Sequence, residues 1–251
     1  MRQNRLEKNY CRRDIIKLLG LGSAGVVLGY DHFPFLVNNA SDFASPALAA
    51  DSPACVVRPA QTEGPYFVDE KLNRSDIRVD PFDNSTRAGV PLRLEFQVSR
   101  IAAGACAPLS GAIVDVWHCD AAGVYSGVRD GRFDARGKKF LRGYQQTNTE
   151  GVATFQTIYP GWYEGRAVHI HFKIRAAAAG ARMQEFTSQL YFDEAVSDEV
   201  FKRSPYNGKR GRRVTNDADF AYRQGGQELL LAPAKHAGGY AAKFDIGLQG
   251  S

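Results

Sequence analysis

A strict alternation of apolar and polar residues is the feature that most restricts how this chain can fold. Over residues 92–98 every second residue is apolar, and residues 168–175 and 188–192 repeat the pattern. Successive side chains of a β-strand point to opposite faces, so a period of two predicts strands with one face in a core. Residues 112–119 are apolar almost throughout, as expected of a strand covered on both faces. These segments predict a β protein.

Turn-forming residues separate the predicted strands. Residues 140–147 and 152–158 flank Asn148-Thr149-Glu150-Gly151, which predicts a β-hairpin. Residues 194–203 precede a proline and predict a short helix. The spacing of the turns is typical of an antiparallel sandwich. We therefore predict an all-β fold over residues 51–251: a single antiparallel β-sandwich with long loops and one or two short helices.

The first 50 residues are predicted to be an export signal. Arg12 and Arg13, followed by two apolar residues and Lys17, resemble a twin-arginine pattern, and Ala47-Leu48-Ala49 fits the small-x-small cleavage rule. The apolar stretch between them, residues 18–29, would reach roughly 18 Å as a helix, short of the ~30 Å hydrocarbon core. We expect residues 1–50 to be removed, and the protein to act in the periplasm or outside the cell without a stable membrane span.

The charge balance argues against one class of partner. A formal net charge of +5 over 251 residues gives no case for binding nucleic acid or an anionic membrane surface. Residues 209–213 form one basic run, Lys-Arg-Gly-Arg-Arg. We expect a solvated loop there, with attraction of carboxylated aromatic compounds as the alternative.

The cysteine count allows one disulfide in the exported chain. Cys11 is lost with the signal, which leaves Cys55, Cys106 and Cys119. Cys55 lies just inside the expected mature N-terminus and Cys106 lies in a Gly-Ala-Cys-Ala-Pro loop, so this pair is the preferred disulfide. Cys119 ends an apolar strand and is expected to be a packed thiol.

The strand at residues 168–175 carries two histidines that share a face. His169 and His171 alternate with apolar neighbours, so both imidazoles point the same way with their roots about 7 Å apart. This arrangement suits one metal ion, although two histidines on the wet face of a half-buried strand are an ordinary alternative. Tyr163 follows a Tyr-Pro-Gly-Trp turn six residues earlier, and Tyr125 follows a turn after another strand. Either tyrosine taken alone is more often a packed residue with a satisfied hydroxyl.

Five segments together resemble the intradiol ring-cleavage dioxygenases, the family of the protocatechuate and catechol dioxygenases, here in an exported form. DVWHCDAAGVY at residues 115–125 and TIYPGWY at residues 157–163 resemble the segments that carry the two tyrosinate ligands. RAVHIHF at residues 166–172 resembles the segment that carries an arginine and the two histidine ligands. SQLYF at residues 188–192 resembles the strand that carries an active-site glutamine. QTEGPY at residues 61–66 resembles a substrate-pocket segment of the protocatechuate type.

The resemblance implies a non-haem Fe(III) site that cleaves a catechol-type ring with O2 to a muconate-type diacid. Phenolates are hard, anionic donors that favour Fe(III). In the implied reaction Tyr163 leaves the metal when catechol binds and takes up a substrate proton, while Arg166 and Gln189 stabilise charge on the substrate. The implied site residues are Tyr125, Tyr163, His169 and His171 for the metal; Tyr163, Arg166 and Gln189 for catalysis; and Thr62, Gly64, Pro65 and Tyr66 for the substrate.

Two departures and two rival hypotheses accompany this prediction. The link between Tyr163 and His169 is shorter than in the best-known members, and Glu164-Gly165 and Val168 replace its usual aromatic and proline residues, so the substrate is not implied. One rival is an exported β-sandwich binding module without redox activity; another is a Zn(II) or Cu(II) enzyme that uses the two histidines. The presence of all four implied ligands favours the dioxygenase. A homo-oligomer is compatible with the sequence.

Overall fold

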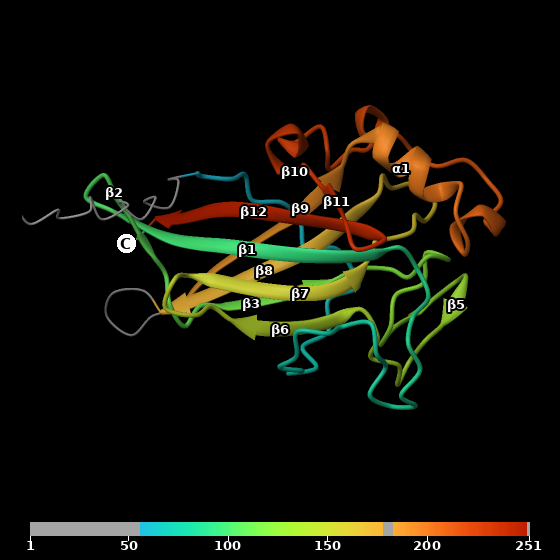
Figure 1. Cartoon of the computed structure of the whole chain (residues 1–251), viewed down its shortest axis with the longest axis horizontal. Helices are drawn as coiled ribbons and strands as arrows, with labels where there is room; N and C mark the ends of the chain where they lie inside the picture. The colour runs from blue at the N-terminus through green and yellow to red at the C-terminus, as the bar shows by residue number, and fades with distance from the viewer. Residues whose placement is uncertain (1–55, 178–182, 250–251) are drawn as a thin grey trace, which may run out of the picture. The chain divides into compact units, whose positions relative to one another are not determined.

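The computed structural model describes residues 56–177 and 183–249 of the chain (Figure 1). Strands dominate this part of the chain, as predicted. The elements are β1 (Pro91–Ala102), β2 (Ala105–Pro108), β3 (Ile113–Trp117), β4 (Arg129–Asp130), β5 (Phe133–Asp134), β6 (Arg142–Gln146), β7 (Val152–Ile158), β8 (His169–Ala177), β9 (Met183–Phe192), α1 (Glu194–Phe201), β10 (Leu230–Leu231), β11 (Ala234–His236) and β12 (Gly239–Gln249).

Two five-stranded sheets contain most of these strands. One sheet has the order β10-β9-β8-β3-β6. The other has the order β11-β12-β1-β2, and β7 also pairs with β1 (Figure 1). β4 and β5 form a separate two-stranded ribbon. The predicted all-β sandwich is thus confirmed.

Aromatic rings from both sheets meet in the core between them. The ring centroid of Phe172 on β8 lies 5.2 Å from Phe96 on β1 and 5.5 Å from Phe244 on β12. All three side chains are buried. Each sits on the inward face of an alternating strand, and burying one such ring contributes roughly 1.5–3 kcal/mol. The alternation that predicted the strands therefore also selects the face that each strand turns inward.

Two strand pairs are parallel, which differs from the predicted antiparallel sandwich. β1 pairs with β12 in parallel, with Phe96 opposite Phe244, and β9 pairs with β10 in parallel. Antiparallel order is imposed only where a short turn joins the two strands. β1 and β12 are the first and last strands of the described chain, so no turn sets their relative direction.

The turn at residues 148–151 does not make the predicted hairpin. Its local geometry is as expected: the Asn148 side chain accepts hydrogen bonds from the backbone N–H groups of Glu150 and Val152, and Gly151 has φ +75°. However, β6 pairs with β3 in one sheet and β7 pairs with β1 in the other. The turn therefore carries the chain from sheet to sheet, because a turn motif specifies a reversal but not the partner strands.

The predicted short helix is present as α1, which ends two residues before the predicted boundary. The Asp193 side chain caps it by accepting hydrogen bonds from the N–H groups of Ala195 and Val196. Three short 3-10 turns follow, at Tyr206–Gly208, Asn216–Ala218 and Gly226–Leu229. None of the helices in the described part is long and apolar enough to cross a membrane.

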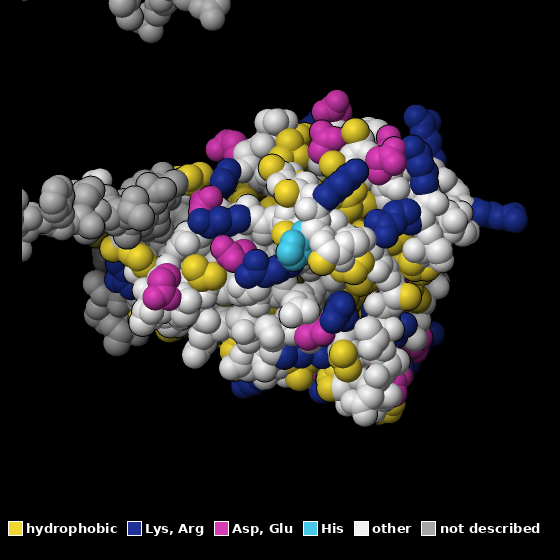
Figure 2. All heavy atoms as spheres, viewed as in Figure 1, with side chains coloured by type: hydrophobic (Ala, Val, Ile, Leu, Met, Phe, Trp, Pro, Cys, Tyr) yellow, Lys and Arg dark blue, Asp and Glu magenta, His cyan; other side chains and the backbone are white. Residues whose placement is uncertain are grey.

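The cysteines and surface charges complete the description. Cys119 is a buried free thiol, as predicted, and Cys106 takes part in a disulfide. Cys55 and the predicted signal at residues 1–50 lie outside the described residues, so the Cys55–Cys106 pairing stays a prediction. Figure 2 shows basic and acidic side chains interspersed over one face of the molecule.

β8 is buried on both faces rather than half-exposed. One face packs in the core, while the N-terminal segment at residues 61–69 lies over the other: the Lys173 side chain pairs with Glu63, and Arg175 with Asp69. The polar face of β8 is therefore not a wet surface, and the histidines on it are enclosed.

Candidate metal centre

Four side-chain donors meet at one point on the polar face of β8. His169 and His171 lie two residues apart on this strand, and their Nε2 atoms are 3.0 Å apart. The hydroxyl oxygen of Tyr125 lies 3.3 Å from His169 Nε2, and that of Tyr163 lies 3.4 Å from the same atom. The four residues predicted as ligands are thus brought together from three separate segments.

Two loops deliver the tyrosines and pack against each other. In the turn before Tyr125, the Asp120 carboxylate accepts hydrogen bonds from the N–H groups of Ala122 and Val124. Gly123 in this turn has φ +86°, and a Cβ there would lie 2.4 Å from the Trp162 carbonyl oxygen. Only glycine allows both the conformation and the close approach. The Tyr125 turn is therefore seated on the residue that precedes Tyr163.

Each imidazole is oriented by its surroundings. His169 Nδ1 lies 2.7 Å from the Ala167 carbonyl oxygen, to which it donates, so Nε2 is the ring atom with the free lone pair. His171 stacks on Trp117, with ring centroids 5.1 Å apart and an interplanar angle of 6°. A Cβ on Gly64 would lie 3.2 Å from His171 Cε1, so the N-terminal segment passes directly against this ring. His171 Nδ1 is buried and has no hydrogen-bond partner.

Burial keeps all four donors neutral in the protein alone. It lowers the pKa of His169 to about 3 and the pKa of His171 well below its usual value. It also raises the pKa of the Tyr125 and Tyr163 phenols above their usual value near 10. A bound cation reverses the preference of the phenols, because its charge stabilises phenolate. The two phenols would therefore ionise at this site only together with a bound cation.

The donor set fits iron. Two imidazole nitrogens that bind the same ion at about 2.1 Å, with an N–metal–N angle of roughly 90°, lie about 3.0 Å apart. The two Nε2 atoms are 3.0 Å apart. Among the described residues no group of three or more His, Cys, Asp or Glu side chains is arranged to hold a metal. The two phenols are thus the remaining donors, and hard phenolate oxygens beside imidazoles suit a trivalent ion better than a soft one.

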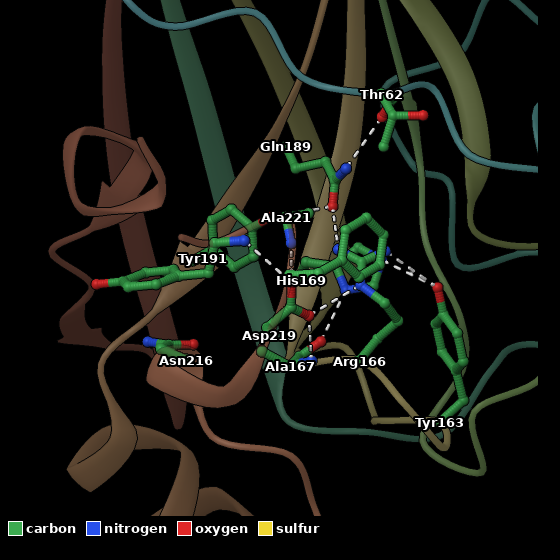
Figure 3. A network of polar contacts seen from close by, with 12 residues as sticks. Thr62, Tyr163, Arg166, Ala167, His169, Gln189, Tyr191, Asn216, Asp219 and Ala221 are labelled. Atoms are coloured by element: carbon green, nitrogen blue, oxygen red, sulfur yellow. Dashed lines mark hydrogen bonds and ion pairs between the residues drawn. The ribbon is translucent and has the colours of Figure 1, made fainter. Parts of the chain in front are cut away.

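Arg166 and Gln189 join the centre, as predicted. The Arg166 guanidinium donates from Nη2 to Gln189 Oε1 at 2.6 Å, and its Nη1 lies 3.5 Å from the Tyr163 hydroxyl oxygen (Figure 3). Gln189 Nε2 donates to the Thr62 carbonyl oxygen at 3.0 Å. A positive charge therefore lies beside Tyr163, and the glutamine connects it to the N-terminal segment.

Asp219 is a residue of this network that the sequence analysis missed. Its Oδ2 accepts hydrogen bonds from Arg166 Nε at 2.8 Å and from the Ala167 N–H at 2.7 Å, while Oδ1 accepts from the N–H groups of Ala221 and Tyr222. Burial alone raises its pKa, but these donors outweigh burial and hold the pKa below its usual value. The bonds to Ala221 and Tyr222 have a turn signature in the sequence, whereas nothing there connects Asp219 to Arg166.

The predicted substrate segment reaches the centre with three of its four residues. Thr62 and Gly64 contact Gln189 and His171 as described above, and the Tyr66 ring stacks on Tyr125 with centroids 4.5 Å apart. The Tyr66 hydroxyl donates to Asp130 Oδ2 at 2.6 Å. Pro65 lies between them and is exposed. The segment thus covers the donors instead of lying apart from them.

Comparisons with known proteins agree with this geometry. The sequence model of a family described as Dioxygenase matches residues 62–250. The solved structure of an intradiol ring-cleavage dioxygenase from Tetranychus urticae superposes with a TM-score of 0.66 at 31% identity, over 77% of this chain and 94% of that one. The dioxygenase domain of a dioxygenase and carbohydrate-binding fusion protein from Streptomyces sp. SirexAA-E gives 0.55 at 28% identity, over 78% and 100%.

A curated relative is similar over a shorter stretch. The chlorocatechol 1,2-dioxygenase of Pseudomonas sp. (strain P51) is 33% identical over an alignment of 102 positions, and the match covers 35% of this chain and 39% of that protein. The chain thus spans less than half of the length of this relative. Since the family match covers most of the chain, the fold and donor set define a protein that belongs to the intradiol ring-cleavage dioxygenase family.

Proposed function

We propose that this protein binds Fe(III) and uses O2 to open a catechol ring between its two hydroxylated carbons. The observation that carries the proposal is the convergence of two phenol oxygens and a second imidazole nitrogen on His169 Nε2, within 3.0–3.4 Å. Both oxygen atoms of O2 enter the muconate-type diacid, so the reaction needs no further reductant. Similarity to intradiol and chlorocatechol dioxygenases supports a catechol as substrate.

Tyr125, Tyr163, His169 and His171 would hold the iron. When bound, the ferric ion supplies a Lewis acid that withdraws electron density from a chelated catecholate, so that a ring carbon reacts with O2. As a phenolate, Tyr163 would accept a proton from a catechol hydroxyl and become a neutral phenol, while Tyr125, His169 and His171 would continue to hold the iron.

Arg166 is placed to stabilise negative charge on the substrate. Its guanidinium lies beside Tyr163 and is fixed by Asp219 and Gln189, so it does not need to reorient during the reaction. A fixed charge of this kind in a site without water typically contributes 10²–10³-fold to the rate. Tyr66 and Trp117 exclude water from the other side, because their rings pack on Tyr125 and His171.

The visible spectrum of the purified protein, recorded anaerobically before and after addition of catechol, tests this function. A red-brown tyrosinate-to-iron band that shifts with catechol and is largely lost in Tyr125→Phe is expected. O2 uptake with formation of the diacid should accompany it in air. A protein that stays colourless after reconstitution with iron would contradict the proposal and favour a binding module, whereas activity with Zn(II) or Cu(II) alone would favour the other rival.

We also propose that the protein is exported through residues 1–50. The paired Arg12 and Arg13, the apolar stretch and the cleavage pattern support this. After expression of the full chain in a bacterial host, N-terminal sequencing should find a chain in the periplasm that begins near Ala50. The Arg12→Lys/Arg13→Lys variant should stay in the cytoplasm, and its normal delivery to the periplasm would contradict twin-arginine export.

A further inference from the structure

A cavity of about 510 Å³ lies beside Tyr163. The ribbon of β4 and β5 and the segment after α1 lie at the same end of the sheets (Figure 1) and both contribute to its wall. A cavity of this size is within the range that holds small molecules. Because Tyr163 belongs both to the donor cluster and to this wall, the cavity adjoins the proposed reaction site.

The wall of this cavity combines an apolar part with a basic part. Phe133 and Trp162 line it together with Tyr163, and Arg210 and Arg212 line it from the basic run identified in the sequence. Gly211, between the two arginines, has φ +109°, and a Cβ there would lie 3.1 Å from Trp162 Cη2. The basic run is thus exposed to solvent, as predicted, and its backbone also packs on the tryptophan that precedes Tyr163.

The cations of the cavity differ in whether they have partners. Lys209 Nζ donates to the carbonyl oxygens of Ala122 and Trp162, and its role is to fix the loop. Arg132 pairs with Asp130 at 3.2 Å and approaches Glu164 at 3.8 Å. Arg210 and Arg212 are exposed and form no ion pair or hydrogen bond with any described side chain. The wall of this cavity therefore includes two arginines whose guanidinium groups have no partner among the described side chains.

We infer that the cavity receives the substituent of the substrate, and that the preferred substrates are catechols with a side chain that ends in an anionic group. The catechol ring would bind at the donor cluster, an apolar spacer would cross Trp162 and Phe133, and the anionic end would reach Arg210 and Arg212. Guanidinium groups bind carboxylate and similar oxyanions through paired hydrogen bonds. This inference about the substrate class rests on the proposed ring cleavage.

Calorimetric binding under argon separates the cavity from the chemistry. The probes are 3,4-dihydroxycinnamate, which carries a carboxylate on a two-carbon spacer, and its uncharged methyl ester, each titrated into the full-length protein as purified. Since two solvent-exposed charge pairs are involved, the acid is expected to bind roughly three- to tenfold more tightly than the ester at low salt. The Arg210→Gln/Arg212→Gln variant should lose this preference.

A matched variant controls for net charge. Arg93→Gln/Lys235→Gln also removes two exposed positive charges, but from β1 and β11, away from the cavity, and it should keep the preference for the acid. Equal binding of acid and ester by the wild type, or an equal loss of preference in both double variants, would overturn the inference.

Oxygen uptake then tests the proposed function independently. Cleavage of catechol, ester and acid with equal kcat/KM would overturn the inference and leave the proposed function standing. A preference for the acid in binding, with no O2 uptake by the iron-loaded protein for any of the three, would overturn the proposed function alone.

Discussion

The polar face of β8 has two halves, which differ in whether their polar side chains have carboxylate partners. His169 and His171 are buried and neutral, have no carboxylate partner among the described residues, and face two phenols. Lys173 and Arg175, one step further along the same face, are each paired with two carboxylates. Those carboxylates are Glu63 and Glu185 for Lys173, and Asp69 and Asp115 for Arg175.

The difference in carboxylate partners distinguishes a structural half of β8 from a functional half. Buried polar groups of native proteins are normally hydrogen-bonded or paired, so the Lys173–Arg175 half needs nothing from outside the chain. In the histidine half, His171 Nδ1 has no partner, and the Nε2 atoms of the two imidazoles lie 3.0 Å apart. The same two-residue spacing on β8 thus gives a pair of histidines without carboxylate partners among the described residues and a pair of cations with them.

The largest expected effect is in the histidine half. His171→Ala removes a proposed metal ligand, so metal affinity should fall by more than the roughly 10–100-fold typical of outer-sphere substitutions. Bound iron, measured by plasma mass spectrometry, should be nearly absent, and the visible band with it. His118→Gln is the control, because His118 is also a buried imidazole but both of its nitrogens are bonded within the protein. Equal iron content in the two variants would refute the comparison.

The strand prediction succeeded where the pattern was local. Residues 152–158 and β7 agree at both ends, and the alternation placed Phe172 and His171 on opposite faces of β8. The parallel β1–β12 pair was not predictable from either strand, because the pairing depends on the packing of distant segments. β12 itself alternates through Phe244, Ile246 and Leu248, a pattern that was present in the sequence and was overlooked.

The site was predicted from motifs rather than from spacing alone. His169 and His171 follow from the strand period, but the tyrosines became candidates only through the family resemblance. Asp219 lies 53 residues after Arg166 and had no signal that linked the two. Contacts between distant loops are set by tertiary packing, which single-sequence patterns do not encode.

Arg166 does not follow the division between paired structural cations and unpaired functional groups on β8, so it tests that division. Like Lys173 it is a cation with a carboxylate partner, yet its guanidinium points to Tyr163. In Arg166→Gln we expect iron to be retained and kcat to fall roughly 100-fold, because a fixed charge near the substrate is lost. Stopped-flow kinetics and iron content measure both. An unchanged kcat would place Arg166 with the structural cations.

Asp219→Asn tests whether Arg166 depends on its anchor. The amide keeps an acceptor oxygen for one set of hydrogen bonds but loses the charge that holds the guanidinium. We expect kcat to fall about tenfold, less than in Arg166→Gln, with the visible band preserved, since a charge-assisted hydrogen bond is roughly twice as strong as a neutral one. A loss of iron from this variant would show instead that Asp219 supports the fold of the centre.

Acid stability sharpens the contrast between imidazoles. Burial lowers the pKa of His118 from 6.5 to about 4, so between these values the unfolded state binds the proton and the folded state does not. The stability that depends on neutral His118 is therefore fully present above pH 6.5. Between pH 6.5 and about 4, the free energy of unfolding declines as the pH falls, by about 1.4 kcal/mol per pH unit. Urea denaturation at pH 7, 6 and 5 should show a shallower decline for His118→Gln than for the wild type. Parallel declines would contradict this assignment.

The smallest effect is expected in the paired half. Lys173 Nζ lies 2.8 Å from Glu185 Oε1 and 4.3 Å from the centroid of Phe67, and it also pairs with Glu63. The carboxylates are 39% and 53% exposed, and such pairs contribute about 0–1 kcal/mol. Lys173→Met keeps the packing on Phe67, so the free energy of unfolding should change by less than about 1 kcal/mol.

The iron content of Lys173→Met decides whether the two halves are independent. Glu63 directly precedes Gly64, which packs against His171, so release of Glu63 is a route by which this substitution could reach the donors. If the packing of Gly64 and the hydrogen bond to Thr62 hold the segment by themselves, iron content equals that of the wild type. Loss of iron would mean that the ion pair positions the segment over His171, and the polar face of β8 would then act as one unit.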